Sequence, residues 1–151
     1  MIEYTVKAYA NGDIYWFLNG VRHREDGPAV EESDGTKSWY FNGKLHREDG
    51  PACEYGEGSK EWYFNGKCHR EDGPAVEYHN GSKEWYKNSL LHREDGPAIE
   101  WANGGKEWYI NGKYLTEEEF LNKTKKHTII IDGQEIQISE ESYKELKESL
   151  N

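Results

Sequence analysis

The sequence predicts a mainly β fold: an elongated, twisted antiparallel sheet of stacked 23-residue β-hairpin repeats, with a small C-terminal α+β cap. Three observations predict it. The run His-Arg-Glu-Asp-Gly-Pro-Ala recurs with a step of 23 residues, a tryptophan recurs with the same step, and turn-forming Asn-Gly pairs separate short alternating segments. Because one copy is too small to bury its own aromatic rings, we expect neighbouring copies to stack and bury them.

Two recurring positions of the repeat are interpreted as structural. A histidine opens each motif, and a tryptophan lies seven residues before it. Leucine replaces the histidine at residue 115, so we assign the array to residues 1–114, beginning with a half-copy at residues 1–15. The structural positions are His23, His46, His69 and His92, together with Trp16, Trp39, Trp62, Trp85 and Trp108.

One copy, residues 74–96, indicates the local structure. Residues 75–78 alternate like a strand, and residues 83–86 form a second, aromatic-rich strand. Asn80-Gly81 between them predicts a hairpin turn in which both residues adopt positive φ. Asn88-Ser89 forms a corner, and the His-Arg-Glu-Asp-Gly-Pro stretch a connecting loop, because proline cannot donate to a strand ladder and aspartate can bond its own backbone. Each repeat is therefore predicted to be one hairpin plus a structured loop.

Residues 115–151 form a different module, predicted to fold as helix, hairpin and helix. Thr116 and Glu119 form a capping-box pattern, so a helix should run to about residue 125. Strands at 127–131 and 135–138 flank the two-residue turn Asp132-Gly133. Ser139 is a suitable N-cap for the last helix. The hairpin–helix part is too small to be stable alone, so it should dock on the last repeat, where it would close the sheet edge, or on another chain.

Composition and charge restrict the function. The chain is 34% hydrophobic and 32% charged, yet it has 6 Trp, 11 Tyr and 4 Phe, enough aromatic surface for a thin core. The net charge is −10, and basic residues are interleaved with acidic ones, which argues against direct binding to nucleic acid or an anionic membrane. We expect the partner to be another protein, and the more specific expectation is a basic nucleic-acid-binding protein.

The start of the chain and the cysteines predict a soluble, cytoplasmic protein. Residues 1–4 lack the basic start and apolar region of a signal peptide, and no apolar run approaches the length of a membrane span. Cys53 and Cys68 stand where other copies have valine, isoleucine or leucine. Both are therefore interpreted as buried thiols acting as small hydrophobes in a reducing compartment.

Neither a metal site nor a catalytic site is expected. Equivalent residues of successive hairpins lie about 10 Å apart, whereas zinc ligands lie about 2 Å from the ion, so equivalent histidines cannot share one. The carboxylates recur in one local setting, which indicates a folding requirement rather than the asymmetric pocket of an enzyme. We predict no catalytic residues, no metal and no cofactor. A small hydrolase is the least favoured alternative, with His69 and Glu71 as the residues to test.

The period of 23 residues and the run Trp-x-x-Asn-Gly-Lys-x-His, at Trp39 to His46 and Trp62 to His69, resemble the MORN repeat family. The turn at residues 78–81 matches the family as well, and the resemblance covers roughly residues 5–114. The family usually has glycine just after the histidine position, where this chain has Arg-Glu-Asp. The version seen here is similar to repeats of bacteriophage and giant-virus proteins. The resemblance implies an elongated sheet used for protein contacts or, in some members, lipid contacts, and the acidic balance disfavours lipid.

If the recurring residues are scaffold, residues that differ between copies are the better candidates for specificity. Trp101 stands where other copies have Glu or Tyr, Lys87 replaces a hydrophobic residue, and Ser89 occupies a turn position that prefers glycine. The apolar stripe of the last helix is the second candidate surface. The predicted protein-binding residues are His79, Lys87, Ser89, Leu90, Trp101, Tyr143, Leu146 and Leu150.

The favoured function is therefore binding without catalysis. The resemblance implies a phage- or mobile-element-type protein that occupies a surface of a host protein in the bacterial cytosol. The most concrete version is an inhibitor of a host defence enzyme such as a CRISPR effector. The alternative is a structural module that self-assembles or forms a homodimer through its C-terminal module.

Overall fold

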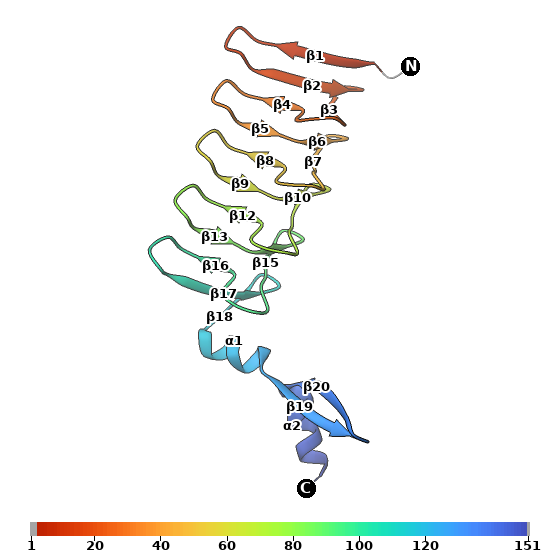
Figure 1. The fold of residues 1–151 in the computed structure, drawn as a ribbon, viewed down its shortest axis with the longest axis vertical. Coiled ribbons are helices and arrows are strands. Elements are labelled where there is room, and N and C mark those ends of the chain that lie inside the picture. Colours follow the sequence, from red (N-terminus) through yellow and green to blue (C-terminus); the bar gives the residue numbers. More distant parts are fainter. Residues whose placement is uncertain (1–2, 151) are drawn as a thin grey trace.

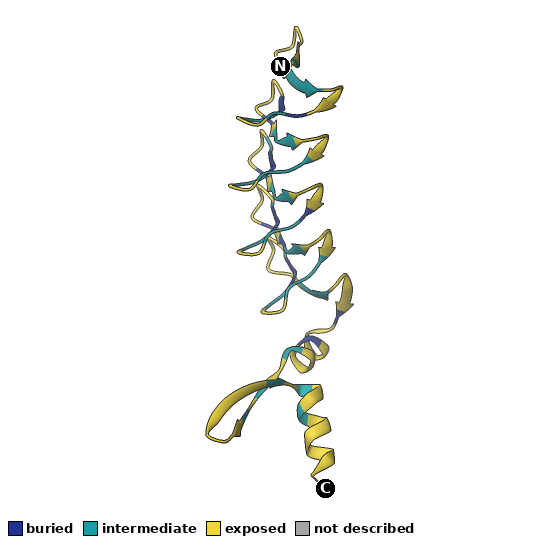
Figure 2. Cartoon of the chain, turned by 90° about the vertical axis from the view of Figure 1, so that its right-hand side faces the viewer, coloured by how far each residue is buried: buried dark blue, intermediate teal, exposed yellow. Residues whose placement is uncertain are grey.

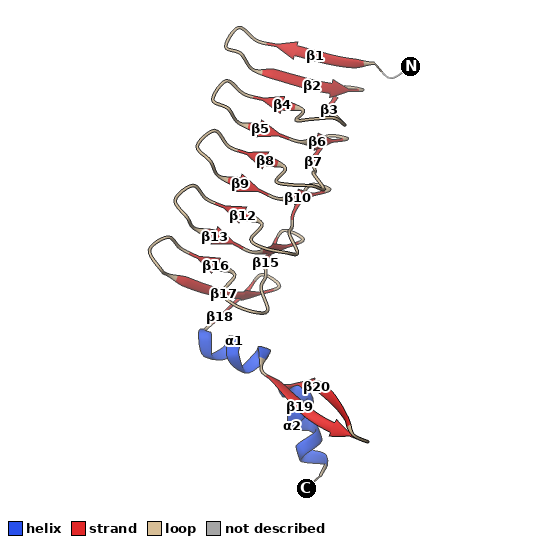
Figure 3. Cartoon of the chain, in the orientation of Figure 1, coloured by secondary structure: helices blue, strands red, loops and turns tan. Residues whose placement is uncertain are grey.

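The computed structural model, which describes residues 3–150, confirms the predicted fold class. Stacked hairpins build one long antiparallel sheet, and two helices with a hairpin between them follow at the C-terminus (Figures 1 and 3). Met1 and Ile2 of the predicted half-copy, and Asn151 of the predicted cap, lie outside the described residues. Neither helix among residues 3–150 is long and apolar enough to cross a membrane.

The long sheet is a meander in which the chain passes from one end to the other. All its strand pairs are antiparallel, and β3 (Val21–Arg22) pairs with β2 beside the main path. The other strands lie in the sheet in this order: β1 (Tyr4–Ala8), β2 (Ile14–Leu18), β4 (Val30–Glu31), β5 (Lys37–Ser38), β8 (Cys53–Glu54), β9 (Lys60–Glu61), β12 (Val76–Glu77), β13 (Lys83–Glu84), β16 (Ile99–Glu100), β17 (Lys106–Ile110) and β18 (Lys113–Leu115).

Each full repeat contains a second, shorter hairpin, which the sequence analysis described only as a corner. Its turn pair adopts two successive left-handed conformations, with φ of 49° at Asn65 and 78° at Gly66. This is the backbone of a two-residue hairpin turn, so the chain reverses and pairs with itself. The short hairpins are β6–β7 (Tyr40–Phe41, Lys44–Leu45), β10–β11 (Tyr63–Phe64, Lys67–Cys68) and β14–β15 (Tyr86–Lys87, Leu90–Leu91), and in the first full repeat the end of β2 pairs with β3 in the same way.

The turn of the longer hairpin differs from its prediction. Of the Asn80-Gly81 pair only Gly81 has positive φ, at 91°. The Gly81 nitrogen donates to the Tyr78 carbonyl at 2.9 Å, and the Asn80 side-chain oxygen accepts from the Ser82 nitrogen at 2.9 Å. Asparagine is therefore used here for the bond to its own backbone two residues on. The strands are also shorter than predicted, covering 76–77 and 83–84 instead of 75–78 and 83–86.

The core is a thin column shared between successive repeats. The alanine that ends each motif is completely buried, as in Ala52 and Ala75. Around Ala75, one cluster contains Cys68 and Val76, and two tyrosines pack against it, Tyr63 from the short hairpin before this motif and Tyr86 from the short hairpin after it. Figure 2 shows these buried residues running along the array. Rings of one repeat thus cover the core of its neighbour, but the repeat tyrosines and tryptophans are themselves only partly buried, so the expectation of an aromatic core is corrected to a core of small side chains covered by rings.

The C-terminal elements follow the predicted order. They are α1 (Glu117–Thr124), β19 (Lys126–Ile131), β20 (Gln134–Ser139) and α2 (Glu140–Ser149). Thr116 and Glu119 form the predicted capping box, and the Ser139 side chain caps α2. Phe120 of α1 is buried, and α1 contacts β17 and β18. α1 makes the main contact with the last repeat, while β19, β20 and α2 lie farther along the long axis of the molecule (Figures 1 and 2). Docking of the hairpin–helix part on another chain stays a prediction.

Candidate binding surface

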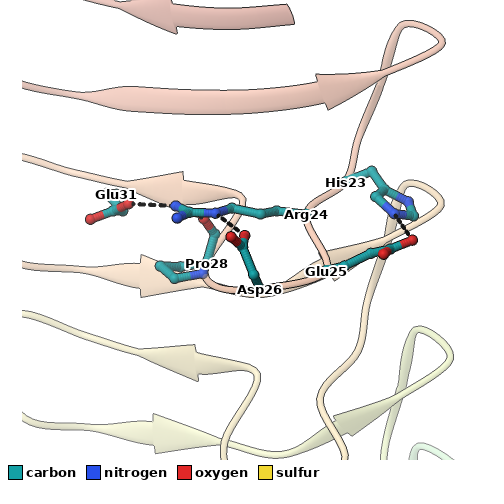
Figure 4. Close-up of polar contacts among 6 residues, drawn as sticks. All are labelled: His23, Arg24, Glu25, Asp26, Pro28 and Glu31. Atoms are coloured by element: carbon teal, nitrogen blue, oxygen red, sulfur yellow. Dashed lines mark hydrogen bonds and ion pairs between the residues drawn. The ribbon is translucent and has the colours of Figure 1, made fainter. Parts of the chain in front are cut away.

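An arginine organises each connecting loop. In the first full repeat, Arg24 Nε donates to Asp26 at 2.8 Å, and Nη1 donates to the Pro28 carbonyl at 3.3 Å and to Glu31 at 3.1 Å (Figure 4). The guanidinium carbon also lies 4.2 Å from the centre of the Trp16 ring, within the range of a cation–π contact. One side chain therefore ties the loop to the hairpin and covers the tryptophan.

The same contacts recur at Arg47, Arg70 and Arg93. The glycine of the motif provides room for them, because a Cβ at Gly50 would lie 3.0 Å from Cζ of Arg47. The bond from Arg47 lowers the pKa of Asp49 below its ordinary value. Sequence reasoning missed this role of arginine, although its recurrence, together with a glutamate seven residues later in each copy, was visible.

The histidine of each motif links two repeats. Nδ1 of His46 accepts a hydrogen bond from the backbone nitrogen of Asn65 in the next short hairpin, at 3.1 Å. His69 accepts from Asn88 in the same way. This bond leaves the proton on Nε2, which lies 3.8 Å from Glu48 in the case of His46. The histidines therefore have structural contacts of the kind predicted for them.

A hydroxyl group makes a second link between repeats, beside the turns of the long hairpins. The Ser59 hydroxyl accepts from the backbone nitrogen of His79, and the Ser82 hydroxyl accepts from that of Ala102, both at 3.0 Å. Asp13 has this role in the half-copy, where its carboxylate accepts from the Ser33 nitrogen at 2.8 Å. These serines are buried, so each link also satisfies a polar group inside the stack.

The sequence departs from the pattern where the stack ends. Leu115 stands in the histidine position and Gly105 in the hydroxyl position, and neither has a following repeat to bind. Thr116 stands in the arginine position and begins α1 instead of a loop. The repeat pattern and the stack of hairpins therefore end at the same place in the chain.

Outside this scaffold, the loops present exposed acids. Glu48 is 80% exposed and Glu71 is 91% exposed, and the neighbouring Asp49 and Asp72 are each 84% exposed. One such pair occurs in each full repeat. We call the row of pairs the acidic ridge: Glu25-Asp26, Glu48-Asp49, Glu71-Asp72 and Glu94-Asp95.

Grooves lie between successive loops of the ridge. The middle groove has a volume of about 880 Å³ and is floored by Trp62, Tyr63 and Phe64, with the acidic pairs of two repeats on its walls. The grooves before and after it have volumes of about 950 and 640 Å³. Phe41 and Phe64 are 42% and 48% exposed, and their rings pack at a tilt against the histidine rings of the preceding repeats. Exposed rings on a charged face are typical of a binding surface.

The two cysteines are buried in the core of the array. Burial raises the pKa of Cys53 to about 11 and that of Cys68 to about 12, since both thiols lie in the core near Glu61. Neither is disulfide-bonded. Burial also raises the pKa of the neighbouring Tyr63 and Tyr86 hydroxyls. Protonated, buried thiols are poor nucleophiles.

The predicted binding residues do not form one surface. His79 and Trp101 lie at the turns of the long hairpins. Lys87, Ser89 and Leu90 belong to a short hairpin on the other side of the array (Figure 1). Trp101 is 41% exposed, and its indole nitrogen donates to Glu107 at 3.2 Å. The remaining three, Tyr143, Leu146 and Leu150, belong to or directly follow α2.

In the C-terminal part, part of the apolar stripe is covered. Tyr143 stacks on His127 with ring centres 3.9 Å apart, and His127 also binds Glu140. Leu146 and Leu150 stay exposed. Sequence reasoning missed three isoleucines of the β19–β20 hairpin that are also exposed, Ile130, Ile131 and Ile136, although the uninterrupted run of isoleucines at residues 129–131 was a signal.

This architecture defines a tandem β-hairpin repeat protein. No protein-family model matches the chain, and a search of curated proteins finds no significant match. The MORN-like character thus stays a prediction that depends on the motifs quoted above. Within residues 3–150, no three His, Cys, Asp or Glu side chains are grouped so that they could hold a metal ion.

Proposed function

We propose that this protein acts by binding another protein through the loop side of its repeat array, without catalysing a reaction. One observation carries the proposal. The motif arginines and histidines make the same internal contacts in successive repeats, so they serve the scaffold, whereas exposed acids and exposed phenylalanine rings share one face. Interfaces of this kind combine aromatic anchors with a charged rim.

The resemblance to phage-type repeats gives the proposal its most specific version. The partner would be a bacterial host protein with a basic surface, and a defence enzyme that normally holds nucleic acid fits this description by charge. The place of action would be the host cytosol, where buried, unpaired thiols such as Cys53 and Cys68 are stable.

The experiment is a pull-down from bacterial lysate with the tagged full chain, read by mass spectrometry. Arg70→Lys, which weakens the scaffold, and Phe64→Ser, which removes an exposed ring, are compared with wild type. We expect a reproducible partner that Phe64→Ser loses while its melting temperature stays close to wild type. Absence of any reproducible partner overturns the proposal.

A second candidate function, self-association, is favoured by one observation. The β19–β20 hairpin has two strands, and Ile130, Ile131 and Leu150 are 69%, 52% and 78% exposed. A two-stranded hairpin is marginally stable alone, and a second copy would cover these side chains. Light scattering over a range of protein concentrations measures the oligomeric state of the wild type and of Ile130→Lys. A wild-type protein that stays monomeric excludes self-association.

A further inference from the structure

The three grooves of the acidic ridge form a series with a regular spacing. The middle and preceding grooves share Phe64, and the walls of each groove are loops of successive repeats. Equivalent residues are two strands apart in the sheet, which places successive grooves about 10 Å apart. The surface therefore offers the same site repeatedly along a line.

Each site is suited to a cation. Around one loop, Arg47 forms ion pairs with two carboxylates, Asp49 and Glu54, and the carboxylate of Glu48 lies 3.8 Å from Nε2 of His46, so negative charge is left over. The Phe64 ring lies in the same groove and is half exposed. Guanidinium and ammonium groups bind to aromatic faces and carboxylates together.

The spacing selects the conformation of the ligand. In a polyproline II segment, every third residue points the same way, and three residues advance about 9 Å. This closely matches the groove spacing of about 10 Å. In a β-strand, residues three apart point to opposite faces, so a strand does not present the same series.

We propose that the acidic ridge binds an extended, polyproline II-type segment of a partner protein that carries arginine or lysine at every third position, one cation in each groove. This rests on the proposed function and names the chemistry of its partner. Aromatic grooves are a known means of binding this helix, because it is already extended before it binds.

The fourth repeat limits the series. Lys87 stands in the place of Phe41 and Phe64 and lines the third groove, where its positive charge repels a cation. Two grooves are therefore strong sites and one is weak. Lys87→Phe, which restores the residue of the other copies, should create a third strong site.

The test uses two synthetic peptides of equal composition, Arg-Pro-Pro repeated three times, and three arginines followed by six prolines. Titration calorimetry with the full chain should give at least tenfold tighter binding of the spaced peptide. Glu48→Gln with Glu71→Gln should weaken this binding at least tenfold. The charge-matched control, Glu57→Gln with Glu118→Gln, changes exposed carboxylates away from the ridge and should leave it within twofold.

Lys87→Phe should tighten the spaced peptide at least threefold. Equal affinity for the two peptides, equal losses in the ridge and control variants, or no binding at all overturns the inference. If the pull-down yields a partner that the Glu48→Gln, Glu71→Gln protein still captures, this inference fails and the proposed function stands.

Discussion

Nδ1 of His46 accepts a hydrogen bond of 3.1 Å from the backbone nitrogen of Asn65, in the short hairpin of the following repeat. The residues are 19 apart in the chain, and the same bond joins His69 to Asn88 and His92 to Asn111. Stability should therefore depend on links between repeats as much as on contacts within one, as in other stacked arrays. The predictions below test both kinds of contact.

Removing a histidine link should loosen the next repeat. His69→Ala leaves the Asn88 nitrogen without its acceptor, at an expected cost of about 1 kcal/mol in unfolding free energy. The Asn88 amide should exchange its hydrogen at least tenfold faster. Native-state hydrogen exchange and urea unfolding measure the two effects. Glu71→Ala is the control, because Glu71 is almost fully exposed; a loss as large there would contradict the role assigned to the histidine.

Arginine should not be replaceable by lysine in the loop. Arg70→Lys keeps the charge but loses the planar donor set that binds Asp72, the Pro74 carbonyl and Glu77 together. We expect a loss of about 2 kcal/mol, measured by urea unfolding. Lys60→Arg, a charge-conserving change at an exposed strand position, should shift stability by less than about 0.5 kcal/mol. An Arg70→Lys protein as stable as wild type would exclude the arginine as the organiser of the loop.

Two variants of Ser89 should separate the effect of backbone strain on stability from the effect of a side-chain hydrogen bond. Its φ of 65° is costly for a residue other than glycine, by about 1 kcal/mol, but its hydroxyl accepts from the Cys68 nitrogen at 3.0 Å. Ser89→Gly removes both effects, so stability should change by less than about 0.5 kcal/mol. Ser89→Ala keeps the strain and loses the bond, at a cost of about 1 kcal/mol. Thermal unfolding of the two variants measures the difference. Equal melting temperatures would show that the hydrogen bond of the Ser89 hydroxyl does not offset the backbone strain.

The buried thiols should make the protein sensitive to alkali. The ordinary pKa of cysteine is 9.0, and in the folded chain it is about 11 for Cys53 and about 12 for Cys68. Below pH 9 the thiols are protonated in both states, and stability is unaffected. Between pH 9 and about 12 the unfolded chain loses these protons and the folded chain keeps them, so stability falls as pH rises.

The control for this prediction uses residues that the repeat itself supplies. Cys53→Val with Cys68→Leu places in these positions the residues found in other copies. Urea unfolding at pH 8, 9 and 10 should show a smaller loss of stability in this variant than in wild type. A decline of equal steepness in both proteins would assign the alkaline sensitivity to the buried tyrosines instead.

Much of the architecture could be predicted, because the pattern repeats. The period, the antiparallel hairpins, the buried cysteines and the capping box of Thr116 and Glu119 all follow from local residue chemistry. The arginine contacts could not be predicted with the same ease. The partners of Arg70 lie eight residues before it, at Trp62, and seven after it, at Glu77, and only the folded loop brings these three together.

The predicted binding residues show a second limit of prediction from sequence, which concerns the residues that share one surface. His79 and Lys87 are close in sequence, but the first lies at one edge of the sheet and the second in a groove near the other. Sequence variation singles out a position and says nothing about which other positions share its surface. The acidic ridge could not be predicted in the same way, because its acids recur in every copy and recurrence by itself indicates a folding requirement.

The sequence by itself determined the repeat unit, its antiparallel hairpins and the burial of Cys53 and Cys68, because these depend on local spacing and on turn chemistry. Only the tertiary structure decided that the histidine of one repeat binds the turn of the next, that arginine orders the loop, and that Glu48, Glu71 and Phe64 share one groove. The physical reason is that hydrogen bonds and charge act through short distances in space. Those distances exist only after successive hairpins have stacked.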